Sequence, residues 1–74
     1  MTLLSYRKKN KLTQKKMAGK LEIDQPYYSK IESGKLKAGM RLVNRIIDLT
    51  DGYVGYKELR PDIYNKIMKE GKDV

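Results

Sequence analysis

The chain has 74 residues and a formal net charge of +8 at pH 7, with 17 lysines and arginines against nine acids. A chain of this length forms one domain, here 1–74, and buries only about 60% of the surface that its unfolded form exposes, so dimerisation is an expected source of extra stability. The absence of cysteine and histidine excludes disulfides and Cys/His metal sites, and no segment approaches the roughly 20 apolar residues of a membrane span, so we expect a cytoplasmic protein without a cofactor.

The N-terminal segment predicts a first helix, with Thr2 as its cap and an end near Asn10. Leu3 and Tyr6 are three residues apart, so they share one face, which we expect to point inward. The sequence after Asn10 breaks the helix before the next cap at Thr13.

Two short helices joined by a tight turn are predicted for residues 13–33. Thr13 is a good N-cap for the first of them. An apolar stripe runs along one side of this helix, formed by Met17, Ala18 and Leu21. Residues 22–23 then turn the chain, and Ile23 places an apolar side chain in the corner.

Either Asp24 or Gln25 caps the second helix of the pair, because a residue before proline avoids helical backbone angles. Tyr28 and Ile31 face inward at a spacing of three, and Gly34 is well placed to end the helix. The outer face is short, polar and cationic, without acids, and consists of Gln25, Pro26, Tyr27, Ser29 and Lys30. Such a face suits the major groove of DNA.

A fourth helix is predicted from about Met40 to Leu49, where apolar residues recur at helical spacing. Val54 is expected to be buried in an extended corner, and one helical turn follows at residues 56–59. Pro61 can start another amphipathic helix, so that the tail 62–74 is either helical or flexible. A helix this short needs a surface to pack on, which is either its own core or a second subunit.

The motif resembles the helix-turn-helix of the Cro and phage-repressor family. The matching residues are LTQ at 12–14, Met17, Ala18, Leu21, Ile23 and IESGK at 31–35. Farther along, the chain resembles small Cro-like and YdaS-type phage proteins at Thr50, Gly52, Val54 and ELRPDIY (58–64), of which LRPDIY is the most specific part. The resemblance covers residues 3–64. Because every apolar segment has helical periodicity and no alternating strand pattern occurs, we expect a compact all-α domain of five helices, with or without an extra C-terminal helix. The chain departs from the family at Glu22, where glycine is usual, and Glu22 is mildly strained if the turn needs a positive φ.

The resemblance places Gln25 at the family's most reliable base-contact position. Its amide can donate to adenine and accept from it at the same time. Pro26 either touches a thymine methyl group or only stiffens the helix start, and Tyr27 either stacks on DNA or remains a partly exposed aromatic. Ser29 and Lys30 lie one turn along, where Lys30 suits a guanine edge or a phosphate.

Phosphate contacts are expected from the elements that flank this helix, because such contacts set the register and make affinity salt-dependent. They are assigned to Gln14, at a helix N-terminus, and to Ser33, Lys35, Lys37 and Arg41. In the family pattern Arg7 pairs with Glu32 at the end of the recognition helix. The alternative for Arg7 is an exposed phosphate contact.

Positive charge is concentrated in the half that contains the motif. Residues 1–45 carry twelve basic and three acidic side chains, a net of +9, whereas residues 46–74 carry five basic and six acidic ones, a net of −1. A polyanion is the natural partner of the first half. The near-neutral second half suits a two-fold contact between two copies, which we assign to Tyr53, Val54, Tyr56 and Ile63.

We therefore expect a dimeric, sequence-specific repressor of phage or prophage type that binds double-stranded DNA, in the nucleoid of a bacterial or phage-infected cell. An enzyme is not expected, because the sequence has no His or Cys, no Gly-rich phosphate loop and no pair of carboxylates in a plausible cleft. The alternative is an antitoxin or adaptor that binds a protein partner through Ile63, Tyr64, Ile67 and Met68. Binding to an acidic membrane is a weaker possibility, since the core already uses the apolar stripes.

Overall fold

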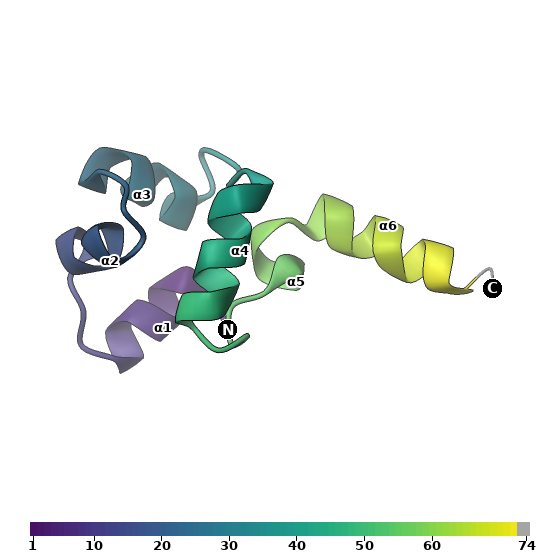
Figure 1. Cartoon of the computed structure of the whole chain (residues 1–74), viewed down its shortest axis with the longest axis horizontal. Helices are drawn as coiled ribbons and strands as arrows, with labels where there is room; N and C mark the ends of the chain where they lie inside the picture. Colours follow the sequence, from purple (N-terminus) through teal and green to yellow (C-terminus); the bar gives the residue numbers. More distant parts are fainter. Residues whose placement is uncertain (73–74) are drawn as a thin grey trace.

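A computed structural model describes residues 1–72, and the side chains of residues 1–69, as an assembly of helices (Figure 1). The helices are α1 (Leu3–Lys9), α2 (Gln14–Lys20), α3 (Gln25–Ser33), α4 (Met40–Leu49), α5 (Tyr56–Leu59) and α6 (Pro61–Lys72). No strand occurs within residues 1–72. The all-α prediction is confirmed, with the extra C-terminal helix as the sixth.

Side-chain caps fix where the first three helices begin. The hydroxyl of Thr2 accepts a hydrogen bond from the Ser5 backbone N–H, and that of Thr13 does the same for Lys16, each at 3.1 Å. For α3 the cap is Asp24, whose carboxylate accepts from the Tyr27 N–H at 2.8 Å, so Gln25 is the first residue of the helix itself. Each cap satisfies a backbone donor that the first helical turn leaves without a partner.

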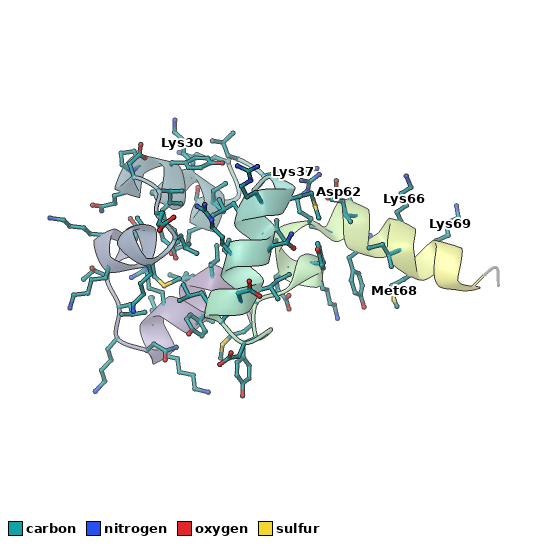
Figure 2. All side chains as sticks on the ribbon, viewed as in Figure 1. Lys30, Lys37, Asp62, Lys66, Met68 and Lys69 are labelled. Atoms are coloured by element: carbon teal, nitrogen blue, oxygen red, sulfur yellow. The ribbon has the colours of Figure 1, made fainter. Side chains whose placement is uncertain are left out.

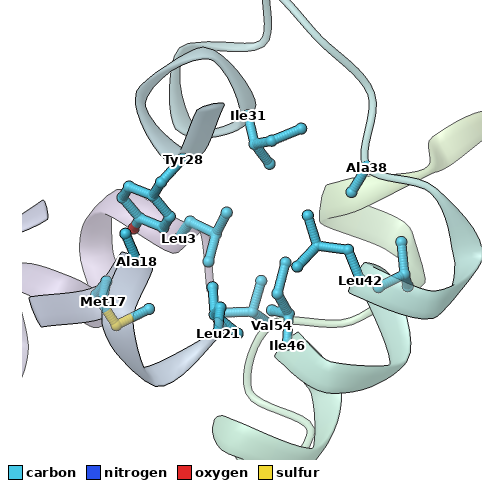
Figure 3. Packing of buried hydrophobic residues seen from close by; sticks show 11 residues of the cluster. Leu3, Met17, Ala18, Leu21, Tyr28, Ile31, Ala38, Leu42, Ile46 and Val54 are labelled. Carbon is cyan, nitrogen blue, oxygen red and sulfur yellow. The ribbon is translucent and has the colours of Figure 1, made fainter. Parts of the chain in front are cut away.

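The core lies where α1, α2, α3 and α4 meet (Figure 3). Its buried members are Leu3, Met17, Ala18, Leu21, Tyr28, Ile31, Ala38, Leu42, Val43, Ile46 and Val54. All four helices contribute, together with three residues outside them (Leu21, Ala38 and Val54), so the core fixes the orientation of α3 relative to the rest of the domain. The apolar stripes predicted for α2, α3 and α4 are the surfaces that this core uses.

Val54 belongs to this core, and its prediction as a dimer contact is therefore wrong. The side chain is 0% exposed. Thr50 holds the loop in place, because its buried hydroxyl donates to the Ile46 carbonyl at 2.8 Å and accepts from the Val54 N–H at 3.2 Å. A second copy of the chain cannot reach Val54 without opening this loop.

Helix α6 projects away from the other helices and makes the molecule elongated (Figure 1). The longest extent of the chain is 42 Å, about twice the next one of 21 Å. Helix α6 packs mainly against the adjacent α5. Two of its apolar side chains stay largely exposed, Ile67 at 54% and Met68 at 47%. Within residues 1–72 no helix is long and apolar enough to cross a membrane.

Candidate nucleic-acid interface

Two buried side chains pack the inner face of α3 against the core. Tyr28 is 0% exposed and Ile31 is 7% exposed, and both point into the core. Gly34 ends the helix in the left-handed conformation at φ 83°, which a glycine adopts without steric cost. Because both ends and the inner face are fixed, the outer face of α3 is held in one orientation.

The turn between α2 and α3 is held by an arginine that the sequence did not single out. Glu22 adopts φ 60°, the positive value considered for this position, and is therefore mildly strained. Arg45 of α4 donates to the Leu21 carbonyl at 3.2 Å and approaches the Glu22 carboxylate at 3.6 Å. Arg45 thus fastens the turn to α4. A backbone carbonyl as the partner leaves no signature in the sequence.

Arg7 and Glu32 form a bidentate ion pair that joins α1 to the last turn of α3. The two N···O distances are 2.9 and 3.0 Å, and the side chains are only 17% and 7% exposed. Arg7 also donates to the Leu12 carbonyl at 3.1 Å, and Gln14 donates to Glu32 at 3.3 Å. The pair thus fixes the angle between α1 and α3, and it occupies the Arg7 side chain internally.

The environment of this pair shifts three pKa values. Burial opposes the charged form of Glu32, but hydrogen bonds led by that of Arg7 outweigh it and lower the pKa of the carboxyl. The hydrogen bond to Glu32 raises the pKa of Arg7. Burial, followed by the nearby Glu32 carboxylate, raises the pKa of Tyr28, whose hydroxyl makes no well-aligned hydrogen bond among the described residues. At neutral pH the ion pair is therefore fully charged.

The outer face of α3 presents the five residues expected to contact bases. Gln25, Pro26 and Lys30 are exposed, Tyr27 is 36% exposed, and Ser29 is partly buried. The nearest acid in sequence, Asp24, is engaged in the helix cap. The outer face therefore offers an amide, a phenol, a hydroxyl and an ammonium group without a carboxylate, since Glu32, the acid within α3, is paired with Arg7.

The residues expected to contact phosphates differ in how exposed their side chains are and in whether these already have a partner. Lys35 and Arg41 are exposed, the first just after α3 and the second in the first turn of α4. Lys37 is 67% exposed and lies 4.0 Å from the Asp62 carboxylate. Ser33 donates its hydroxyl to the Lys30 carbonyl at 3.2 Å. Gln14 is partly buried and directs its amide N–H at Glu32, so its backbone rather than its side chain is available at the start of α2.

The remaining residues of the expected dimer contact lie in different settings. Tyr53 is 64% exposed in the loop after α4. The hydroxyl of Tyr56 donates to Asn44 of α4 at 3.0 Å, which fastens α5 to α4. Ile63 is partly buried at the start of α6. Tyr53 thus remains available to a second copy, and Tyr56 and Ile63 are available in part.

A family model described as a helix-turn-helix domain matches residues 2–50 of the chain. The match spans α1 to α4, and therefore the whole core apart from Val54. It ends before α5, so the LRPDIY run lies outside it. No curated protein and no solved structure matches the chain significantly.

Proposed function

Because the chain belongs to the helix-turn-helix domain family, whose members act as DNA-binding regulators, we propose that it is a sequence-specific transcriptional repressor. It inserts α3 into the major groove of an operator and thereby occludes the promoter. The observation that supports this proposal best is the acid-free outer face of α3, which the buried Tyr28 and Ile31 hold rigidly outward.

Base recognition rests on the N-terminal part of α3. The major groove, about 12 Å wide, admits one α-helix, and the N-terminal residues of a recognition helix contact base edges. Gln25, the first residue of α3, is exposed and can form two hydrogen bonds with adenine. Pro26, Tyr27 and Ser29 complete the contact surface. Lys30, one turn farther along, reaches a guanine edge or the adjacent phosphate.

The protein's charge supplies the part of the affinity that is independent of sequence. The +9 charge of residues 1–45 is carried by the elements around α3, and the exposed Lys35 and Arg41 flank the groove-binding face. Ser33, the backbone at Gln14 and Lys37 supplement them. Each phosphate contact releases a bound cation from DNA, so affinity falls steeply as salt rises.

We propose that two copies bind a palindromic operator. A contact through the near-neutral half, at Tyr53, Tyr56 and Ile63, avoids bringing two +9 surfaces together. It leaves two recognition helices about 34–36 Å apart, one turn of DNA. The test is the number of chains bound to a full palindrome and to a half-site. Tyr56→Asp is expected to weaken palindrome binding and to leave half-site binding intact. One chain saturating the full palindrome would refute the dimer.

The resemblance to small Cro-like and YdaS-type phage proteins supports a phage or prophage origin for this repressor. The residues that carry it lie in the C-terminal part, chiefly LRPDIY at 59–64, beyond the helix-turn-helix match.

Sequence specificity is tested by two variants that remove different kinds of contact. Gln25→Ala is expected to relax the preference at one base position by about 1–3 kcal/mol, because it removes a bidentate base contact. Arg41→Ala is expected to weaken binding to all sequences equally, because a phosphate contact carries no sequence information. If Gln25→Ala weakens all sequences alike, Gln25 does not read a base.

A second function is favoured by one observation, the exposed apolar stripe of α6. Ile67 and Met68 lie beside the partly buried Ile63 and Tyr64 on a helix that packs mainly against α5. An antitoxin or adaptor would use this stripe to bind a protein, with DNA binding serving its own regulation. Removal of residues 62–74 would then abolish capture of that partner while operator binding persists. If the chain without residues 62–74 still captures the partner, this function is refuted.

A further inference from the structure

We infer that α6 is a DNA-backbone arm, in which Lys66 and Lys69 bind phosphates beyond the groove that α3 enters. This inference rests on the proposed DNA-binding function and extends it to a part of the chain outside the helix-turn-helix match. Four observations support it: the anchoring of α6, the direction of its lysines, the positive charge of the side that they share, and the length of the molecule.

The base of α6 is fastened to the loop that follows the recognition helix. Arg60, immediately before α6, donates to the Ala38 carbonyl at 2.9 Å and pairs with the Asp62 carboxylate at 3.0 and 3.2 Å. Lys37, in the same loop as Ala38, lies 4.0 Å from Asp62. The direction in which α6 leaves the domain is therefore linked to the position of α3.

The lysines of α6 project toward the same side of the molecule as those of the recognition region. Asp62, Lys66 and Lys69 are spaced by four and three residues and therefore share one face of the helix. Figure 2 shows Lys66 and Lys69 on the side where Lys30 and Lys37 also project, whereas Met68 projects from the opposite side. In this view the four lysines follow one side of the molecule as a row that begins on α3 and ends on α6.

The residues of this row carry a net positive charge. Asp62, the acid that shares the lysine face of α6, pairs with Arg60 at 3.0 Å and lies 4.0 Å from Lys37, and the hydrogen bond from Arg60 lowers the pKa of Asp62 to about 2. Neither Lys66 nor Lys69 is ion-paired with an acid among the described side chains. Although the net charge of residues 46–74 is only −1, one side of α6 is therefore basic.

The molecule is long enough to reach across one turn of DNA. The longest extent is 42 Å, with α3 toward one end and α6 at the other, and one turn of DNA spans about 34–36 Å (Figure 1). When Lys30 lies at the major groove, the lysines of α6 face phosphates outside that half-site. A second copy of the chain fits this row poorly, because it would bring like charges together, whereas DNA offers an anionic backbone along the whole row.

The experiment compares Lys66→Gln/Lys69→Gln with the wild-type chain on two duplexes that carry one selected half-site. One duplex has an extra turn of DNA on both sides, and the other is trimmed to the half-site. On the extended duplex the slope of log affinity against log salt is expected to flatten by about 1.8, or about 0.9 for each lost phosphate contact, so a fourfold rise in salt costs the variant about twelvefold less affinity than it costs the wild type. On the trimmed duplex both proteins are expected to give the same slope.

Two control variants separate a phosphate contact from a general effect. Met68→Gln changes the opposite side of the same helix and is expected to leave the slope unchanged. Lys8→Gln/Lys9→Gln removes the same amount of charge from α1, where Lys9 lies near Thr50 and Tyr53. This variant is expected to leave the difference in slope between the two duplexes unchanged. Equal slopes for the wild type and the α6 variant on the extended duplex would overturn the arm, as would a flattened slope on the trimmed one. If the wild type selects no DNA at all, the proposed function itself fails.

Discussion

Replacing Arg7 by alanine is expected to lower the free energy of unfolding by about 3–5 kcal/mol, the usual loss when one partner of a buried ion pair is removed. The magnitude follows from the geometry. Glu32 is 7% exposed and receives two charge-assisted hydrogen bonds from Arg7, at 2.9 and 3.0 Å. Without Arg7, the 3.3 Å contact from Gln14 is its remaining side-chain hydrogen bond, which leaves a carboxylate nearly buried and unpaired.

A loss of this size is large for a chain of this length. Domains are stabilised by about 0.05–0.15 kcal/mol per residue, so a total of about 4–11 kcal/mol is expected for 74 residues. A deficit of 3 kcal/mol lowers the melting temperature of so small a domain by about 12–24 °C. The assay is urea unfolding followed by circular dichroism at 222 nm, supported by a thermal melt.

The decisive experiment is a double-mutant cycle that combines Arg7→Ala with Glu32→Ala. We expect a coupling energy of about 2–3 kcal/mol, whereas an exposed pair gives less than about 1 kcal/mol. The double variant Arg7→Met/Glu32→Met is expected to be more stable than Arg7→Ala, because two apolar side chains leave no unpaired charge. A coupling energy near zero would refute the reasoning.

Acid provides a second test of the same pair. The pKa of Glu32 is lowered from its ordinary value of 4.5, so its charged form stabilises the folded state above that value, and the stabilisation is lost as the pH falls through the lowered pKa. The stability difference between the wild type and Glu32→Gln is therefore expected to be constant from pH 7 to about 5 and to shrink below about 4.5. A difference that stays constant down to pH 2 would show that the carboxyl is not stabilised in its charged form.

At both Gly34 and Gly19 an added Cβ meets nothing within 4 Å, so the two positions differ mainly in backbone conformation. Gly34→Ala is expected to lower the free energy of unfolding by about 1–2 kcal/mol, because Gly34 has a φ of +83°. Gly19→Ala, within α2, is expected to raise it by about 0.5–1 kcal/mol. Equal effects in urea unfolding would contradict the conformational explanation. Tyr28→Phe is expected to leave stability unchanged or raise it by about 1 kcal/mol, because it removes a buried hydroxyl without an aligned partner; a loss above about 1 kcal/mol would show that the hydroxyl bonds to Glu32. Lys35→Ala is expected to flatten the salt dependence of DNA binding by about one unit of slope, and an unchanged slope would show that Lys35 touches no phosphate.

The sequence predicts the helices well because their limits depend on local chemistry. The Thr2 and Thr13 caps, the left-handed Gly34 and the apolar residues of α2 and α4 all act over three or four positions. The choice between Asp24 and Gln25 as the cap of α3 needed the structure, because both satisfy the same sequence rule. The structure gives that role to Asp24.

Long-range placement could not be predicted in the same way. Apolar spacing indicates that a helix has an apolar face, but not what covers it, so the exposure of Ile67 and Met68 did not follow from the pattern. Val54 was expected to be both buried and a dimer contact, and only its burial is confirmed. Arg45 and Arg60 bind backbone carbonyls of distant residues, and such partners cannot be identified from residue types.

The most direct test of the proposed repressor is selection of bound sequences from a random pool of double-stranded DNA by the full chain. We expect an inverted repeat whose half-site centres lie about 10–10.5 base pairs apart, the spacing of two recognition helices on one side of DNA. Repeating the selection with Gln25→Ala is expected to lose the preference at one position in each half-site and to keep the rest. Enrichment of no sequence, or of a motif without two-fold symmetry, would contradict the proposal that a dimer reads this DNA through α3.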